Sequence, residues 1–141
     1  MIEKLCIIPA RGGSKRIPRK NIKNFLGKPI IAYSIEAAIE SGLFDEVMVS
    51  TDDEEIAKIA RQYGAKVPFF RSKKTADDFA TIENVIKEVL DCYEKKGQVF
   101  DNFCCVSSTN PLLKTDHLSE SYFLFSKSNF DSLFPVIRYS Y

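Results

Sequence analysis

A short glycine-containing stretch near the start of the chain concentrates the residues that bind phosphate. Residues 9–21 read PARGGSKRIPRKN, and no acidic residue occurs between Arg11 and Lys23. The stretch follows an apolar run at residues 5–8, which is typical of a short buried strand. Paired glycines let the backbone turn tightly and present N–H groups, while the basic side chains supply positive charge. A strand leading into such a loop predicts a phosphate-binding site. A solvated basic loop is the alternative.

The overall charge shows that this positive character is local. The chain has 141 residues, with 20 Lys and Arg against 19 Asp and Glu, and a net charge of +1. The nearly neutral balance argues against general nucleic-acid binding. A small anionic ligand therefore fits the basic loop better than a polymer does. The length and the ordinary composition predict a single domain over residues 1–141.

Cysteine usage and hydropathy bear on the compartment. The four cysteines, Cys6, Cys92, Cys104 and Cys105, show no metal-finger or redox-motif spacing. We expect free thiols in a reducing cytoplasm. The start of the chain does not read as a signal peptide, and no apolar run approaches transmembrane length. The sequence predicts a cytoplasmic protein without membrane contact.

Strand and helix patterns alternate along the chain. We expect strands at residues 5–8, 46–50, 66–70, 103–106 and 131–137. We expect helices at residues 29–41, 52–63, 81–95 and 116–125. This order predicts an α/β fold with three layers and a mainly parallel sheet. Ligands bind at the carboxyl ends of such strands. The basic loop, the turn at 50–53, the segment 71–81 and the turn at 107–111 should therefore share one rim.

The loop and the VSTDDEEIA turn resemble those of the CMP-acylneuraminate cytidylyltransferases, which activate nine-carbon acidic sugars with CTP. The family's first motif, P-A-R-G-G-S-K-x-I-P-x-K-N, is matched at every fixed position. Sialic acid members typically have glycine where this chain has Arg16, so the loop is more similar to the pseudaminic acid branch. The resemblance extends over residues 7–137. It implies a Rossmann-like nucleotidyltransferase fold of the GT-A type.

The resemblance also implies roles for individual residues. Arg11 and Lys20 would be catalytic and hold the CTP phosphates. The expected nucleotide-binding set is Ala10, Gly12, Gly13, Ser14, Lys15, Asn21, Arg71, Ala80 and Thr81. The expected contacts to the acidic sugar are Arg16, Ser107 and Thr109. For Arg16 and Arg19, a carboxylate contact and simple solvation of the loop are equally favoured. Mg²⁺ is the expected cofactor, and a homodimer is the expected state of the full-length family.

Two features depart from the family pattern. The turn at 107–111 reads SSTNP, where family members often have QPTSP and use the glutamine for a ligand contact. Family members also continue well beyond Tyr141. We therefore expect this chain to lack the family's C-terminal part, with its metal-binding aspartates, another active-site arginine and the dimer-forming arm. No metal ligand is assigned within the chain.

Several polar and aromatic residues have structural interpretations. Helix capping is favoured over metal binding for Asp52 and Asp53, and a cap region over catalysis for Asp77 and Asp78. His117, the single histidine, is expected to be solvated at a helix start. The aromatic residues late in the chain are expected to lie in the core, or to be surface-exposed near the C-terminus. They are Tyr122, Phe123, Phe125, Phe130, Phe134, Tyr139 and Tyr141.

The function that these features predict is cytidylyl transfer from CTP to a nonulosonic acid, pseudaminic or sialic, with release of pyrophosphate. One alternative is a cytidylyltransferase for a keto-deoxy-octulosonate sugar. Another is a non-catalytic CTP-binding or assembly module. A Walker-type kinase is disfavoured, because Gly13, Ser14 and Lys15 stand in the wrong order for that loop.

Overall fold

The centre of the protein is a parallel sheet of three strands. A computed structural model describes residues 3–140. In it, β1 (Lys4–Pro9) lies between β4 (Glu46–Ser50) and β5 (Asn102–Cys105), and both neighbours run parallel to it. Ile7 is the partner of Met48 on one side. The predicted α/β class and parallel sheet are confirmed.

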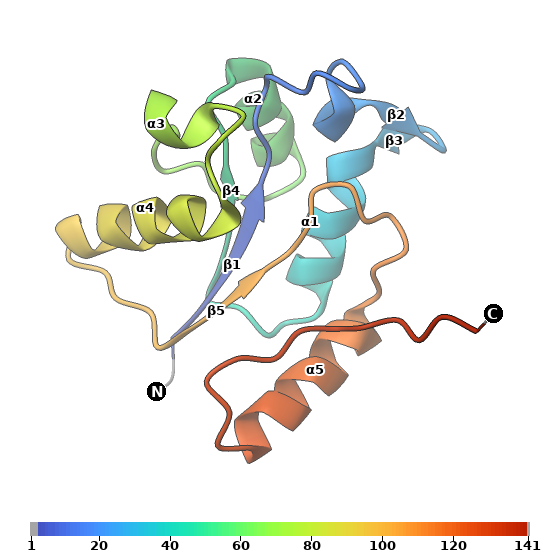
Figure 1. Ribbon diagram of the computed structural model, residues 1–141, viewed down its shortest axis with the longest axis vertical. Coiled ribbons are helices and arrows are strands. Elements are labelled where there is room, and N and C mark those ends of the chain that lie inside the picture. The colour runs from blue at the N-terminus through green and yellow to red at the C-terminus, as the bar shows by residue number, and fades with distance from the viewer. Residues whose placement is uncertain (1–2, 141) are drawn as a thin grey trace.

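Helices cover both faces of this sheet and give three layers (Figure 1). On one face lie α1 (Ile30–Glu40), α2 (Glu54–Gln62) and α5 (Thr115–Lys127). On the other face lies α4 (Ile82–Lys95). The apolar side chains of α4 recur at helical spacing, which explains why this helix could be predicted from the sequence.

The alternation of side chains along β1 divides the core in two. Successive residues of a strand point to opposite faces of a sheet. Cys6 and Ile8 therefore join the core beneath α1 and α2, while Leu5 and Ile7 join the core beneath α4. All four side chains are fully buried. β1 thus fixes the position of the basic loop that follows it.

Three short elements were not expected from the sequence. They are the 3₁₀ turn η1 (Lys20–Ile22), the hairpin of β2 (Asn24–Phe25) with β3 (Lys28–Pro29), and α3 (Lys73–Ala76). In the hairpin, Leu26 and Gly27 have φ of 48° and 94°. Positive φ at both turn positions is the type I′ requirement, which Asn-Gly usually meets. Leu-Gly is not a typical sequence for this turn, so the hairpin could not be predicted from the sequence.

The strand expected at residues 66–70 is wrong. Lys66 makes a single parallel bridge to Met48, and the chain then leaves the ladder. Pro68 has no N–H to donate, which is the physical reason that pairing stops. The backbone rejoins the sheet edge only at Arg71, whose N–H donates to the Thr51 carbonyl at 2.8 Å.

The strand expected at residues 131–137 is also wrong. This segment has no strand partner and every residue in it is exposed. Pro135 lacks an N–H donor for a ladder. The expectation that the late aromatic residues belong to the core is wrong for Phe123, Phe130 and Phe134, which are exposed, whereas Tyr122 and Phe125 are half-buried. Tyr139 is exposed as well, as the alternative expectation had it, and Tyr141 lies outside the described residues.

The capping expected for Asp52 and Asp53 is found for one of the two. Asp53 caps α2 by accepting from the Ile56 N–H at 3.0 Å, whereas Asp52 accepts from the Gly12 N–H. At α5, Lys114 precedes the helix and Asp116 lies in its first turn. His117 is exposed, as expected, and its Nδ1 accepts from the Lys114 N–H at 3.3 Å.

The cysteines and the helices agree with two further expectations. Cys6, Cys92, Cys104 and Cys105 are free thiols. Burial raises the pKa of Cys6 and Cys104, which disfavours their reactive thiolate forms. Among residues 3–140, no helix combines the length and apolar character needed to span a bilayer.

A pair of substitutions distinguishes core from surface near the C-terminus. Leu118→Ala is expected to lower the free energy of unfolding by about 2–4 kcal/mol, because this α5 side chain is only 7% exposed. Phe134→Ala should change it by less than about 0.5 kcal/mol, because Phe134 is 74% exposed. Urea unfolding followed by circular dichroism measures both. A large loss in Phe134→Ala would contradict the exposed position of this segment.

Candidate active site

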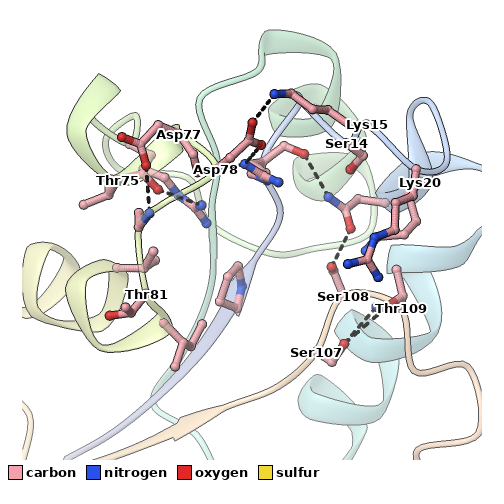
Figure 2. Close-up of a pocket in the computed structure, with 18 of the residues that line it drawn as sticks. Ser14, Lys15, Lys20, Thr75, Asp77, Asp78, Thr81, Ser107, Ser108 and Thr109 are labelled. Carbon is pink, nitrogen blue, oxygen red and sulfur yellow. Dashed lines mark hydrogen bonds and ion pairs between the residues drawn. The ribbon is translucent and has the colours of Figure 1, made fainter.

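A cleft of about 810 Å³ opens at the carboxyl ends of the strands. Its walls come from three segments far apart in the sequence: the basic loop after β1, the stretch from Arg71 to Val85, and the turn after β5 (Figure 2). The turn after β4 lies behind the basic loop and holds it by a hydrogen bond from the Gly12 N–H to Asp52. The predicted common rim is therefore present.

Most of the residues expected in the site line this cleft. They are Arg11, Ser14, Lys15, Arg16, Lys20, Asn21, Arg71, Ala80, Thr81, Ser107 and Thr109. Three expected residues do not line it: Ala10 is buried in the core, and Gly12 and Gly13 contribute loop backbone behind it. The cleft also contains residues that the sequence did not single out as site residues: Pro9, Ile17, Thr75, Asp77, Asp78, Ile82, Val85, Cys105 and Ser108.

Asn21 ties the basic loop to the turn after β5. Its Nδ2 donates to the Arg11 carbonyl at 2.9 Å, and its Oδ1 accepts from the Ser108 hydroxyl at 2.7 Å. Both Asn21 and Ser108 are buried. The amide therefore links the two segments across the cleft. The sequence signal for Ser108 was its place in the SSTNP turn, but its partner is 87 residues away.

Gly12 approaches the turn after β4 too closely for a side chain. Its N–H donates to Asp52 Oδ1 at 2.8 Å. A Cβ at this position would lie 2.7 Å from Asp53 Oδ2 and 2.9 Å from Asp53 Cβ. At Gly13, by contrast, nothing lies within 4 Å of such a Cβ. Of the two glycines, Gly12 is the one that the packing requires.

Arg19 locks the far side of the loop onto α2. Its backbone is left-handed, with φ of 54°. Its guanidinium donates to Asp53, with Nη2 to Oδ1 at 2.9 Å, and also pairs with Glu55. This hydrogen bond from Arg19 holds the pKa of Asp53 down, from an ordinary 3.8 to about 2. Arg19 is therefore committed to loop structure, which answers the open question about its role.

Arg71 is a buried cation in the wall of the cleft. It is 9% exposed, and it donates from Nη2 to the Ser50 carbonyl at 2.8 Å and from Nε to the Ser50 hydroxyl at 3.1 Å. Within residues 3–140 it makes no ion pair with a carboxylate. Burial lowers the pKa of its guanidinium, because removal from water disfavours the charged form. Asp52 and Glu88 act against this shift without forming an ion pair with Arg71, so the wall of the cleft keeps a buried positive charge.

Arg11 and Lys15 are already paired with an acid. Arg11 Nη1 donates to Asp78 Oδ1 at 2.8 Å and to the Asp77 carbonyl at 2.7 Å, and Lys15 pairs with Asp78 Oδ2. These two cations lower the pKa of Asp78, Lys15 more strongly than Arg11. Asp78 is thus a counter-ion, where a role in the cap region of α4 was expected. Thr81 caps that helix, with its hydroxyl accepting from the Asn84 N–H at 3.3 Å.

The opposite end of the cleft keeps its positive charge available. Lys20 and Arg16 are exposed, line the cleft and form no ion pair within the described part of the chain. Ser107 and Thr109 lie on the turn that Lys20 faces in Figure 2, and their hydroxyls are 3.4 Å apart. This end therefore combines free cations with hydroxyl groups, a set that suits a polyhydroxylated acid.

The residues present do not fit a magnesium site. No group of three or more His, Cys, Asp or Glu side chains in residues 3–140 is arranged to hold a metal ion. Asp52, Asp53 and Asp78 each accept hydrogen bonds from the donors described above. The expectation of Mg²⁺ therefore rests on the resemblance, and we derive no step through the ion.

The chain is similar to known proteins over nearly its whole length. The sequence pattern of the family described as Cytidylyltransferase matches residues 5–137. The chain belongs to the cytidylyltransferase family. Within this family, the chain is 49% identical over 140 residues to a pseudaminic acid cytidylyltransferase of Campylobacter jejuni, and 42% identical over 132 residues to N-acylneuraminate cytidylyltransferase A of Danio rerio.

These relatives are longer than the present chain. The alignment to the Campylobacter protein covers 99% of this chain and 60% of the relative, and that to the Danio protein covers 94% and 30%. A solved structure titled as CMP:2-keto-3-deoxy-manno-octonic acid synthetase complexed with CTP superposes with a TM-score of 0.72. It covers 88% of this chain and 47% of its own length at 23% identity. It supports the Rossmann-like cytidylyltransferase fold.

The Arg19–Asp53 pair predicts a specific loss of stability in acid. The pKa of Asp53 in the folded protein is lowered to about 2. The ion pair therefore contributes fully to the free energy of unfolding above the ordinary pKa of 3.8, and this contribution is lost as the pH falls from there toward 2. Asp53→Asn keeps a capping oxygen but removes the charge. It should lower the free energy of unfolding at pH 7 by about 0.5–1 kcal/mol, since the pair is partly exposed.

Thermal unfolding between pH 6 and pH 2 checks this prediction. The difference between wild type and Asp53→Asn should shrink through the acid range, whereas the exposed substitution Asp131→Asn should follow the wild type throughout. A constant difference at every pH would show that the charge pair is not its cause.

The two glycines provide a matched test of the loop. Gly12→Ala should lower the free energy of unfolding by roughly 1–3 kcal/mol, because the added methyl group collides with the Asp53 side chain that caps α2. Gly13→Ala should change it by less than about 0.5 kcal/mol. Chemical denaturation of both variants provides the measurement, and equal effects would contradict the close approach at Gly12.

Proposed function

We propose that this chain binds CTP in the cleft and contributes to transfer of its cytidylyl group to a nonulosonic acid, with pseudaminic acid as the first candidate. The observation that carries the proposal is the position of the family's PARGGSKRIPRKN loop. The basic side chains of this loop line a cleft that also contains the buried Arg71, which forms no ion pair within residues 3–140. Such a site offers a triphosphate both side-chain and backbone donors.

The roles of the residues follow from their positions. Arg11, Lys15 and Lys20 are loop cations that line the cleft, and they would bind the phosphates. The first turn of α4 also lines the cleft, and a helix N-terminus favours an anion. Asn21 would act as a positioning residue, since its hydrogen bonds commit its side chain to the loop and to the turn after β5. The buried Arg71 would add positive charge to the wall of the cleft. Arg16, Ser107 and Thr109 would face the sugar.

The reaction itself requires positioning more than covalent chemistry from the protein. The anomeric hydroxyl of the sugar would attack the α-phosphorus of CTP and release its proton to water, forming a new P–O bond and breaking the bond to the β-phosphate. Pyrophosphate leaves with the bonding electron pair. Cations aligned on the phosphates stabilise the negative charge that develops on the leaving oxygens.

The choice of sugar rests on similarity. Identity to the protein named as a pseudaminic acid cytidylyltransferase, 49%, exceeds identity to the protein named as an N-acylneuraminate cytidylyltransferase, 42%. Arg16 is the loop residue that departs from the sialic acid form of the motif. The octulosonate alternative has support only from the fold. A CTP-binding module without turnover remains the second candidate, because the chain spans 60% of the Campylobacter relative.

Calorimetric titration with CTP, with ATP as control, tests nucleotide binding. Arg11→Ala should weaken CTP binding roughly 10- to 100-fold, the effect of losing charged hydrogen bonds to phosphate. Arg138→Ala removes an equal charge outside the cleft and should leave binding within about twofold. ATP binding as tight as CTP binding would overturn the cytidine assignment.

Pyrophosphate release then identifies the acceptor. Pseudaminic, sialic and keto-deoxy-octulosonic acids are compared at equal concentration with CTP and Mg²⁺. Preferential release with pseudaminic acid is the expected result. CTP binding without release from any acceptor would favour the binding module, and release with the octulosonate alone would favour that sugar.

A further inference from the structure

Two carboxylates accept hydrogen bonds from donors of the basic loop. Asp78 accepts from Arg11 and pairs with Lys15, while Asp52 accepts from the Gly12 N–H at 2.8 Å. Asp52 lies outside the cleft, whereas Asp78 lines it. Of the two acids, Asp78 is therefore the one that competes directly for the groups assigned to the nucleotide phosphates.

The turn at Asp77 holds Asp78 in this position. The N–H groups of Phe79 and Ala80 donate to Asp77 Oδ1 at 2.9 and 2.7 Å. Arg11 Nη1 donates to the Asp77 carbonyl as well as to the Asp78 carboxylate. Figure 2 shows the side chains of Asp78 and Lys15 pointing toward each other at the rim of the cleft. A fixed turn thus directs one carboxylate at two loop cations.

Carboxylate and phosphate oxygens accept hydrogen bonds from the same donors. We propose that Asp78 is an internal substitute for a nucleotide phosphate: it holds Arg11 and Lys15 in place until the phosphate chain of the nucleotide displaces it. This inference rests on the proposed function. It predicts that Asp78 orders the loop and at the same time lowers its affinity for phosphate, because displacement leaves a carboxylate beside the incoming negative charge.

The distribution of charge in the cleft supports this division of roles. Lys20 and Arg16 line the cleft without a carboxylate partner in residues 3–140, so an anion can reach them without exchange. Arg11 and Lys15 can bind a phosphate only if it replaces Asp78 as their partner. Binding would therefore begin at the free cations and be completed by transfer of the paired ones.

Asp78→Asn tests the exchange, with Glu94→Gln as the charge-matched control. Each variant removes one negative charge, but Glu94 lies near the C-terminal end of α4, outside the cleft. Calorimetry with CTP and with pyrophosphate should show binding tightened roughly three- to tenfold in Asp78→Asn, the order expected for removing two partly exposed ion pairs. Glu94→Gln should stay within about twofold of the wild type.

The outcomes separate this inference from the proposed function. If Asp78→Asn binds CTP no more tightly than the wild type does, the inference is overturned and the proposed function stands. Tighter pyrophosphate binding in Asp78→Asn, without selective CTP binding by either protein, would support the exchange and overturn the cytidine assignment. Failure of both ligands to bind either protein would overturn both.

Carbon-13 NMR of the side-chain carboxyls provides a readout on the unaltered chain. The pKa of Asp78 should lie below its ordinary value in the free protein, because Lys15 and Arg11 stabilise its charged form. Saturation with pyrophosphate should raise that pKa, since the cations are withdrawn and negative charge approaches. An unchanged or lower pKa in the complex would show that Asp78 keeps its partners and would overturn the proposal.

Discussion

The basic loop depends on a close approach between its backbone and the turn after β4. The Ala10 N–H donates to the Ser50 carbonyl at 2.9 Å, and the Gly12 N–H donates to Asp52 two residues later in both segments. The absence of a side chain at Gly12 makes this spacing possible. Because β4 is itself fixed by parallel pairing with β1, the loop inherits its position from the sheet.

This constraint has an electrostatic consequence. Holding five basic side chains on one loop is unfavourable unless nearby groups compensate, because like charges at short range repel. The fold supplies acids from behind and from across the loop: Asp53 and Glu55 bind Arg19 on the outer side, and Asp78 binds Arg11 and Lys15 on the cleft side. The outer pairing is permanent structure, whereas the cleft-side pairing faces the ligand.

The architecture could be predicted from the sequence because its signals are local. Apolar runs marked β1, β4 and β5, the helical spacing of α4 was regular, and parallel strand order brought the loops to one rim. Residues 66–70 and 131–137 also looked like strands, but hydrogen-bond ladders need a partner with free donors. Pro68 and Pro135 interrupt them, so alternation of side chains alone was not sufficient. The Leu-Gly turn of the β2–β3 hairpin lacked the usual residue signature.

The partners of the site residues could not be predicted in the same way, because they depend on tertiary contacts between distant segments. Asp77 and Asp78 read as part of a helix cap region, and only the fold shows that one of them reaches Arg11, 67 residues earlier. Asn21 likewise follows the family motif, but its contact with Ser108 is set by the β1–β5 pairing. A motif specifies which groups are available to a ligand. The pairing of those groups with protein acids then determines how readily the ligand obtains them.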